Sequence, residues 1–326
     1  MKDTKFYIGP MSKNIVDAVI EVCEEENLSL GLIPSRRQIE YNGGYVNNWK
    51  TLDFFTYVRN KTDKVILQRD HGGRLQGDKD CHHLSSFEAD AKAGFDLIHV
   101  DPWKKTEGIE EAAHETIKNI RYCNMINPRC LYEVGTEEAI QKYTYKELDT
   151  FLNILRSNLD NLWTSIKYAV IQSGTRIIGT ENVGVFDEHR CKEMIKVCNK
   201  YGLLSKEHNG DYLTTPQKKK RFEMGVSAIN IAPEFGVCET DLLLKKMSDD
   251  DIEKMYEVCF LSKRWKKWTS PDFDAQAQKV ELIRVCAHYV FADPRVIEIK
   301  KKMYNIDSEL KTAIKDKISF MCGAVQ

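Results

Sequence analysis

Short apolar segments alternate with amphipathic ones along the first 240 residues. Eight segments have the apolar character of β-strands, and they lie at 6–9, 28–34, 64–68, 97–101, 130–135, 168–174, 203–208 and 228–232. Between them, apolar residues recur at helical spacing in segments 15–26, 52–59, 86–93, 109–126, 145–159, 191–201 and 214–224. This alternation predicts parallel strands joined by crossover helices.

The number of these units favours one particular α/β architecture. Eight strand–helix units within residues 1–240 are typical of a closed (β/α)8 TIM barrel. An open, doubly wound sheet is the alternative, but no glycine-rich dinucleotide-binding loop follows the first strand. Residues 241–326 have helical patterns, so we expect a C-terminal helical extension packed on the barrel.

Composition and charge narrow the class of protein. The 326 residues include 48 Lys and Arg against 49 Asp and Glu, so no overall charge would attract nucleic acid or an anionic membrane. No apolar run reaches the length of a membrane span, and the N-terminus does not resemble a signal peptide. The 10 cysteines form no CxxC pair, which indicates free thiols in a reducing compartment. We therefore expect a cytoplasmic protein.

Acidic residues and histidines follow the predicted strands at the end where barrels carry their active sites. Asp70 and His71 close the third strand, Asp101 closes the fourth, Glu137 follows the fifth and His208 ends the seventh. Imidazole and carboxylate groups are ligands of zinc and similar divalent ions. A divalent ion would act as a Lewis acid and stabilise an enediolate, while a neighbouring carboxylate moves a proton.

These observations predict a set of metal ligands and a set of catalytic residues. The predicted ligands are His71 and His208, with Glu137 or Asp101 as a further ligand. The predicted catalytic residues are Asp70, Glu137 and Asp101. Zinc is the preferred ion, and manganese, cobalt and nickel are alternatives.

Other histidines and acids in the same region have plainer interpretations. His99 lies inside an apolar strand and is interpreted as a core histidine or a support for the ligands. Glu133 is either functional or the partner of an ion pair inside the barrel. His82 and His83 are interpreted as ordinary loop histidines.

Basic and polar residues near the strand ends are candidates for binding a phosphorylated substrate. Arginine suits bidentate contacts with phosphate, and Arg36 and Arg37 also lie near a strand end. The absence of a Walker-type loop argues against ATP as a substrate. The predicted substrate-binding residues are Arg69, Arg74, Lys206, Gln172, Asp211, Asn42 and Gly43. The basic runs 218–221 and 263–267 are interpreted as solvated helix faces.

Six segments resemble, in order, the subunit of class II D-tagatose-bisphosphate aldolases that is described as non-catalytic. They are Ile39–Tyr45, Val65–Gly73, Ala93–Asp101, Tyr132–Glu137, Val170–Gly174 and Glu207–Pro216. The resemblance implies a barrel related to metal-dependent class II aldolases. The chain departs from the family pattern at Arg69, at 102–105 and at 209–210, which lie around the predicted pocket, so the sugar is not carried over.

Three functions remain open from the sequence. The first is a divalent-metal-dependent lyase that cleaves or forms a carbon–carbon bond in a phosphorylated ketose. The second is a metal-dependent epimerase of a ketose or ketose phosphate, and the third is a non-catalytic subunit that stabilises a separate aldolase. The expected partners are a small phosphorylated sugar and either a second copy of the chain or an aldolase subunit, with no nucleic acid and no membrane.

Overall fold

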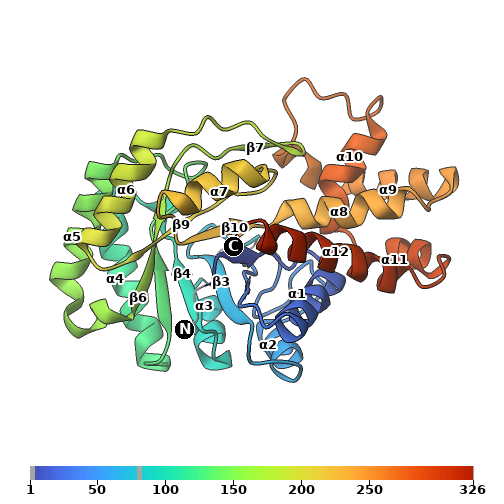
Figure 1. Ribbon diagram of the computed structural model, residues 1–326. Helices are drawn as coiled ribbons and strands as arrows, with labels where there is room; N and C mark the ends of the chain where they lie inside the picture. Colours follow the sequence, from blue (N-terminus) through green and yellow to red (C-terminus); the bar gives the residue numbers. More distant parts are fainter. Residues whose placement is uncertain (1–3, 79–82, 326) are drawn as a thin grey trace.

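The structure is a closed barrel of eight parallel strands surrounded by helices (Figure 1). It is a computed structural model and describes residues 4–78 and 83–325. The strands follow the order β1-β10-β9-β6-β5-β4-β3-β2, and β1 pairs with both β2 and β10 to close the ring. Their bounds are β1 Phe6–Ile8, β2 Gly31–Leu32, β3 Ile66–Gly72, β4 Leu97–Val100, β5 Leu131–Val134, β6 Ile166–Ile171, β9 Leu204–Glu207 and β10 Ala228–Ile231. The predicted TIM barrel is confirmed.

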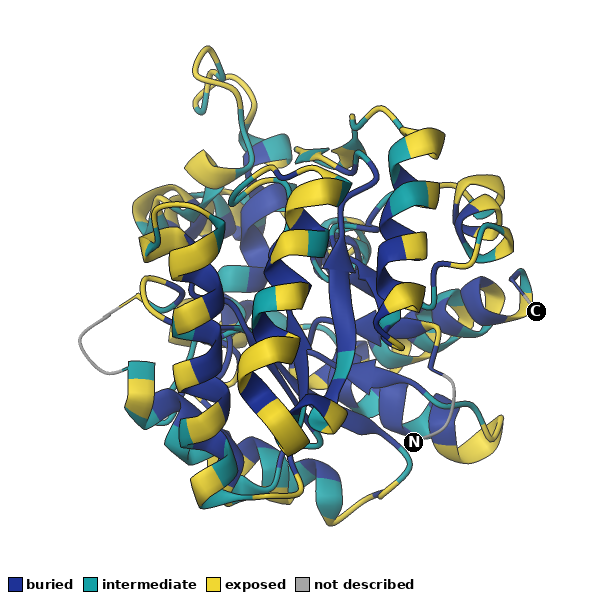
Figure 2. Ribbon diagram, turned by 90° about the vertical axis from the view of Figure 1, so that its left-hand side faces the viewer, coloured by how far each residue is buried: buried dark blue, intermediate teal, exposed yellow. Residues whose placement is uncertain are grey.

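Each crossover helix buries one face against the strands and leaves the other exposed (Figure 2). Helix α5 starts where the Thr144 hydroxyl and the Glu147 carboxylate cap each other's backbone amides. The helices around the barrel are α1 Lys13–Glu25, α2 Thr51–Arg59, α3 His83–Ala93, α4 Ile109–Ile126, α5 Tyr145–Leu159, α6 Glu188–Lys200, α7 Thr215–Glu223 and α8 Pro233–Leu244. Short 3-10 helices are η2 Trp103–Lys105, η3 Asp160–Ser165, η4 Arg264–Lys267 and η5 Ala287–Tyr289. His83 therefore begins a helix, while His82 lies outside the described residues.

Side chains fill the barrel interior in layers, because alternate residues of a strand face inward. On β3, Ile66, Gln68 and Asp70 face inward in successive layers toward the strand's carboxyl end. On β9, the inward-facing residues Leu204, Lys206 and His208 follow in the same order from apolar to polar. The lowest layer is apolar and consists of Tyr7, Ile33, Ile66, Leu97, Tyr168 and Ala228, with Leu131 and Leu204 against it. The layers above it are polar, so the inside of the barrel changes from apolar to charged toward the mouth.

The C-terminal part differs from the expected division at residue 240. That boundary falls inside α8, and α12 (Ile306–Gly323) packs against α1, where Ile314 and Ile318 join the core of the barrel. Three helices, α9 (Asp249–Ser262), α10 (Lys279–Cys286) and α11 (Pro294–Lys301), build a separate small core beside the barrel (Figure 1). The chain thus leaves the barrel after α8 and returns to it with α12.

Three further observations complete the description of the fold. A small antiparallel hairpin, β7 (Ile177–Ile178) and β8 (Glu181–Asn182), lies in the connection after β6 and was not expected from the sequence. The nine described cysteines are all free thiols. Within residues 4–78 and 83–325, no helix combines the length and the apolar character that a bilayer crossing requires.

Candidate metal centre

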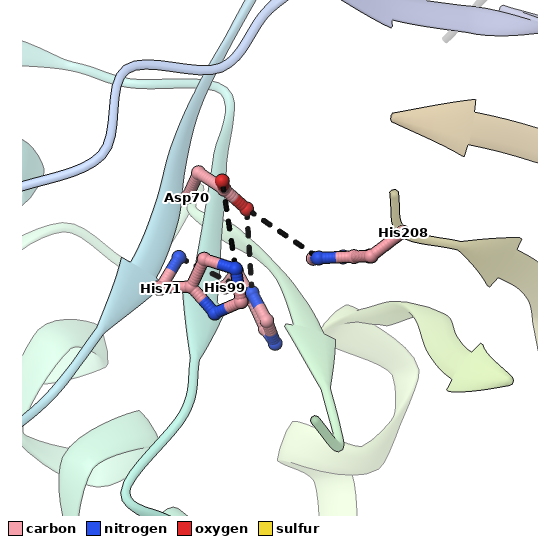
Figure 3. Close-up of side chains that lie close together, drawn as sticks. All are labelled: Asp70, His71, His99 and His208. Atoms are coloured by element: carbon pink, nitrogen blue, oxygen red, sulfur yellow. Dashed lines mark hydrogen bonds and ion pairs between the residues drawn. The ribbon is translucent and has the colours of Figure 1, made fainter. Parts of the chain in front are cut away.

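Four side chains converge at the carboxyl end of the barrel (Figure 3). Asp70 and His71 come from β3, His99 from β4 and His208 from the end of β9. One ligand atom of each lies within 4.8 Å of those of the other three. The centroids of the three imidazole rings are 5.0–5.1 Å apart. The structure therefore brings His71 and His208 together, and it adds His99, which the sequence had suggested was a core or supporting histidine.

A bulge in β3 lets two consecutive residues face the same space. The pairing of β3 with β4 shifts between Arg69 and Gly72, and His71 has a left-handed backbone with φ of 46°. Consecutive residues of a regular strand point to opposite faces, so without the bulge Asp70 and His71 would diverge. A Cβ atom on Gly72 would lie 2.8 Å from the carbonyl oxygen of His99, so the close approach of β3 to β4 requires glycine.

An oxygen atom holds the outer nitrogen of each imidazole. His71 Nδ1 lies 2.6 Å from Asp101 Oδ2, and His99 Nε2 lies 2.9 Å from the carbonyl oxygen of Gly135. Because a carbonyl oxygen only accepts hydrogen bonds, His99 Nε2 carries a proton that it donates to Gly135. The backbone N–H of His71 donates to His99 Nδ1 at 3.3 Å, which supports the tautomer with the proton on Nε2.

The third imidazole follows the same pattern. His208 Nε2 lies 2.6 Å from Glu133 Oε1 and 3.1 Å from the side-chain amide of Asn230, and His208 Nδ1 is buried with no hydrogen-bond partner among the described residues. Histidines that bind metals usually donate the N–H of the other ring nitrogen to a carboxylate or a carbonyl. A buried ring nitrogen without a partner is unfavourable unless something binds it. The donor set of this centre therefore fits a divalent ion.

The spacing of the inner atoms also fits an ion between them. Asp70 Oδ1 lies 3.7 Å from His99 Nδ1 and 3.8 Å from His208 Nδ1, and Asp70 Oδ2 lies 3.7 Å from His71 Nε2. These separations are too long for direct hydrogen bonds. The Asp70 carboxylate is therefore not bonded to the rings, and it would lie beside an ion that the three imidazoles hold.

Charges in the centre stabilise one another. Burial by itself would raise the pKa of Asp70, but the imidazoles of His71, His208 and His99 outweigh it and lower the pKa below its usual range. Burial would lower the pKa of His71, but the charges of Asp70, Glu137 and Asp101 raise it to about 10. The carboxylates and the imidazoles of the centre thus compensate each other's charges.

The two further predicted ligands have different positions. Asp101 is fully buried behind His71 and also accepts a hydrogen bond from Gln76 Nε2 at 2.9 Å, so it orients the imidazole. Glu137 lies at the rim, where Oε2 is 3.8 Å from His71 Nε2 and accepts a hydrogen bond from Asn209 Nδ2 at 2.6 Å. The four converging side chains therefore include neither Asp101 nor Glu137.

Two of the predicted phosphate ligands are inside the protein, which corrects that expectation. Arg69 is fully buried outside the barrel wall, where it donates two hydrogen bonds of 2.7 Å to Asp90 of α3. Its guanidinium also donates to the carbonyl oxygens of Pro34 and Ile39 at 2.9 and 2.7 Å. Lys206 is fully buried inside the barrel, below the metal centre. Neither side chain can reach a phosphate at the mouth.

Gln172 and Asp211 are also buried and serve the framework. Gln172 Oε1 accepts a hydrogen bond of 2.6 Å from Arg190. Asp211 Oδ1 accepts the backbone N–H groups of Ala232 and Glu234, both at 2.8 Å, at the start of α8. Burial, together with the charge of Glu234, raises the pKa of Asp211 to about 7. These contacts use the polar atoms that the sequence had suggested were for substrate.

The other predicted substrate-binding residues lie near the mouth but away from the metal centre. Asn42 and Gly43 line a cavity of their own beside Arg36, in the connection after β2. Arg74 is exposed in the connection after β3. The structure therefore does not bring Asn42, Gly43 or Arg74 to the four converging side chains.

A pocket opens directly above the centre, and Asp70, His71 and Glu137 belong to its walls. Three cations from separate segments also line it, namely Arg37 after β2, Lys104 in η2 and Lys267 in η4. Lys267 belongs to a basic run that the sequence suggested was a solvated helix face. Its position follows from the return of the C-terminal part to the barrel mouth, which no local pattern reveals.

The C-terminal part closes one side of this pocket, held by one contact within itself and two contacts to the barrel loops. Trp268 Nε1 donates to the hydroxyl of Tyr289 at 3.0 Å, and Trp268 O accepts the N–H of Gly179 from the β7–β8 hairpin at 2.7 Å. Arg264 forms a bidentate ion pair with Asp78 after β3. These contacts hold Trp268 and Lys267 over the mouth, so residues beyond 240 complete the pocket.

Comparisons with known proteins identify the fold. No family model and no curated protein matches the sequence. Among solved structures, a probable tagatose 6 phosphate kinase from Sinorhizobium meliloti 1021 superposes with a TM-score of 0.80 at 15% identity, covering 99% of this chain and 100% of that chain. A fructose-bisphosphate aldolase from Campylobacter jejuni gives 0.61 at 14% identity, covering 99% and 89%. An aldolase from Escherichia coli K12 gives 0.56 at 13% identity, covering 94% and 93%.

The chain shares its fold with these proteins. The first superposition covers almost the whole of both chains, so the C-terminal helices α9–α12 are included in the similarity. At 13–15% identity, the comparisons show the fold alone.

Proposed function

We propose that this protein is a divalent-metal-dependent lyase that forms or cleaves a carbon–carbon bond of a phosphorylated ketose, as class II aldolases do. The observation that carries the proposal is the convergence of three imidazoles on Asp70, each with one ring nitrogen held by an oxygen. The other ring nitrogens of His71 and His208 face the Asp70 carboxylate. The names of the aldolases that share the fold, and the motifs that resemble the tagatose-bisphosphate aldolase subunit, support the same chemistry.

The residues of the centre divide into ligands, supports and proton carriers. His71, His99 and His208 would hold the ion, and Asp101 and Glu133 fix the rings of His71 and His208. When bound, a divalent ion supplies a Lewis acid that polarises a substrate carbonyl. The remaining groups must then orient the sugar and move protons.

Asp70 and Glu137 are the candidate proton carriers. Retro-aldol cleavage removes a proton from a hydroxyl group and later returns a proton to carbon, so it needs a carboxylate beside the substrate. Asp70 borders the pocket, and its neighbouring imidazoles keep it charged. Glu137 accepts a hydrogen bond from Asn209 and lies 3.8 Å from the same His71 Nε2 atom that Asp70 approaches, so it is the candidate for the second acid.

Arg37, Lys104 and Lys267 are the candidate phosphate ligands. They replace Arg69 and Lys206 in this role, because all three line the pocket that contains Asp70 and His71. Arginine and lysine are the side chains that bind phosphate dianions most strongly. A phosphate held among them would keep the sugar chain within reach of the metal centre.

The proposal is tested by elemental analysis and by NMR of substrate mixtures. We expect the purified protein to bind one equivalent of a divalent ion and to cleave a ketose phosphate only with the ion present. Epimerisation without cleavage would indicate the second function considered above. No turnover, with recovery of a separate aldolase from the native host in a pull-down, would indicate the stabilising subunit. Full activity in the presence of a strong chelator would refute the proposal.

A further inference from the structure

A fully buried lysine lies one layer below the metal centre. Lys206 precedes His208 by two residues on the same strand, and its side chain is 0% exposed. Its ammonium donates to Gln68 Oε1 at 2.7 Å and lies 2.8 Å from Glu133 Oε2. From below, it contacts the face of the Tyr7 ring, 3.3 Å from the ring centroid. The cation is therefore held on several sides and has no access to substrate.

Glu133 connects this lysine to the metal centre. Its Oε2 atom accepts from Lys206 and from Gln68 Nε2 at 2.7 Å, while its Oε1 atom lies 2.6 Å from His208 Nε2. Glu133 is 0% exposed as well. The hydrogen bonds from Lys206 and Gln68 fix the plane of the carboxylate, so its other oxygen points at His208.

Stability alone does not explain a lysine at this position. The layer below is apolar, and replacing a buried ion pair by apolar residues of similar volume is often neutral or stabilising. A buried carboxylate without a cation, in contrast, is strongly unfavourable. The lysine is needed only if the carboxylate is needed, and the carboxylate orients a metal-facing histidine.

We propose that Lys206 is a positioning residue of the metal centre, which acts through Glu133 to hold His208 with its Nδ1 atom free for the ion. The inference rests on the proposed metal-dependent function. It gives Lys206 a role different from the phosphate contact expected from the sequence. It also extends the metal site one layer deeper into the barrel, to Gln68 and Tyr7.

The test compares Lys206→Met with Lys218→Met. Lys218 is the matched control, because it is also buried, donates to the carbonyl of Leu213 at 2.8 Å and lies 3.8 Å from Glu234, away from the metal centre. Loss of a support behind a metal ligand weakens metal binding by about 10- to 100-fold. We expect Lys206→Met to weaken zinc binding by this factor in calorimetry, and Lys218→Met to leave it unchanged.

Spectroscopy separates positioning from a general loss of stability. Long-range ¹H–¹⁵N spectra of histidine-labelled, metal-free protein report which ring nitrogen of His208 carries the proton. We expect Nε2–H in the wild type and in Lys218→Met, and a mixture of tautomers in Lys206→Met. The visible spectrum of the Co²⁺-loaded protein should change only in Lys206→Met. Wild-type zinc affinity and spectra in folded Lys206→Met would overturn the inference, as would equal effects of the two variants.

A second variant covers the case in which Lys206→Met does not fold. Lys206→Met with Glu133→Gln removes both charges and avoids an uncompensated carboxylate, so we expect it to fold and still to bind zinc about 10- to 100-fold more weakly. Wild-type affinity in this variant would overturn the inference. If the wild type itself binds no divalent ion, the proposed function fails, and the tautomer of His208 in the metal-free protein still decides the role of Lys206.

Discussion

Arg69 offers a sharp test of the difference between the sequence interpretation and the structure. The sequence suggested that it binds phosphate, whereas in the structure its guanidinium is fully buried between β3 and α3. It pairs with Asp90 through two hydrogen bonds of 2.7 Å and donates to the carbonyl oxygens of Pro34 and Ile39. The informative perturbation is Arg69→Met, which keeps much of the apolar stem and removes the guanidinium.

The structure indicates the size of the effect. Removing one partner of a buried ion pair costs about 3–5 kcal/mol, because Asp90 is left as an uncompensated charge. Each of the two buried carbonyl groups that lose a donor adds about 1–3 kcal/mol. A domain is stable by only about 5–15 kcal/mol in total. We therefore expect Arg69→Met to lose about 5 kcal/mol or more, which is a large part of the folding free energy.

Urea unfolding followed by circular dichroism measures this loss, and a double variant identifies its source. Arg69→Met with Asp90→Leu removes both charges, so we expect it to recover about 3 kcal/mol relative to Arg69→Met. The KM for a phosphorylated substrate should stay close to that of the wild type in whatever fraction folds. A loss of less than about 1 kcal/mol, accompanied by weaker phosphate binding, would refute the reasoning and restore Arg69 as a phosphate ligand.

Three further predictions concern the metal, the substrate and pH. His208→Ala should lose its divalent ion on dialysis against a weak chelator, as measured by elemental analysis, whereas the exposed His114→Ala should retain it. Lys267→Gln should raise the KM for a phosphorylated ketose by about 10-fold, and its neighbour Lys266→Gln should not; equal values for both would exclude the phosphate role. Asp211 has a folded pKa of about 7 against 3.8 for the free group, so the folded state holds its proton longer and stability falls as pH rises from about 4 through about 7. Asp211→Asn keeps the acceptor oxygen without the charge, so its urea midpoint should exceed that of the wild type at pH 8. If the stability of Asp211→Asn fell with pH between about 4 and about 7 as steeply as that of the wild type, the assignment would be contradicted.

Local patterns were enough to predict the barrel. All eight strands were located from apolar runs, and two helices, α4 and α5, have the predicted bounds. In a parallel barrel every strand ends at the same face. Polar residues at the strand ends are therefore neighbours in space, which is why the sequence could predict that Asp70, His71 and His208 lie together.

Depth within the barrel could not be predicted from the same patterns. Arg69 and Lys206 are both close to strand ends, but Arg69 points outward to α3 and Lys206 points inward below the mouth. His99 has apolar neighbours in sequence because β4 is buried on both sides, and this concealed its place beside His71. Which residues reach a ligand depends on the bulge in β3 and on strand register, and these are tertiary properties.

The sequence by itself determined the alternation of strands and helices, and with it the barrel and the face at which its chemistry gathers. It did so because hydrophobic periodicity is a local property that each segment carries. Only the tertiary structure decided which atoms hold each imidazole, which charges are paired inside, and that Lys267 from the C-terminal part borders the pocket. Those outcomes depend on contacts between residues far apart in the chain, and no local pattern records such contacts.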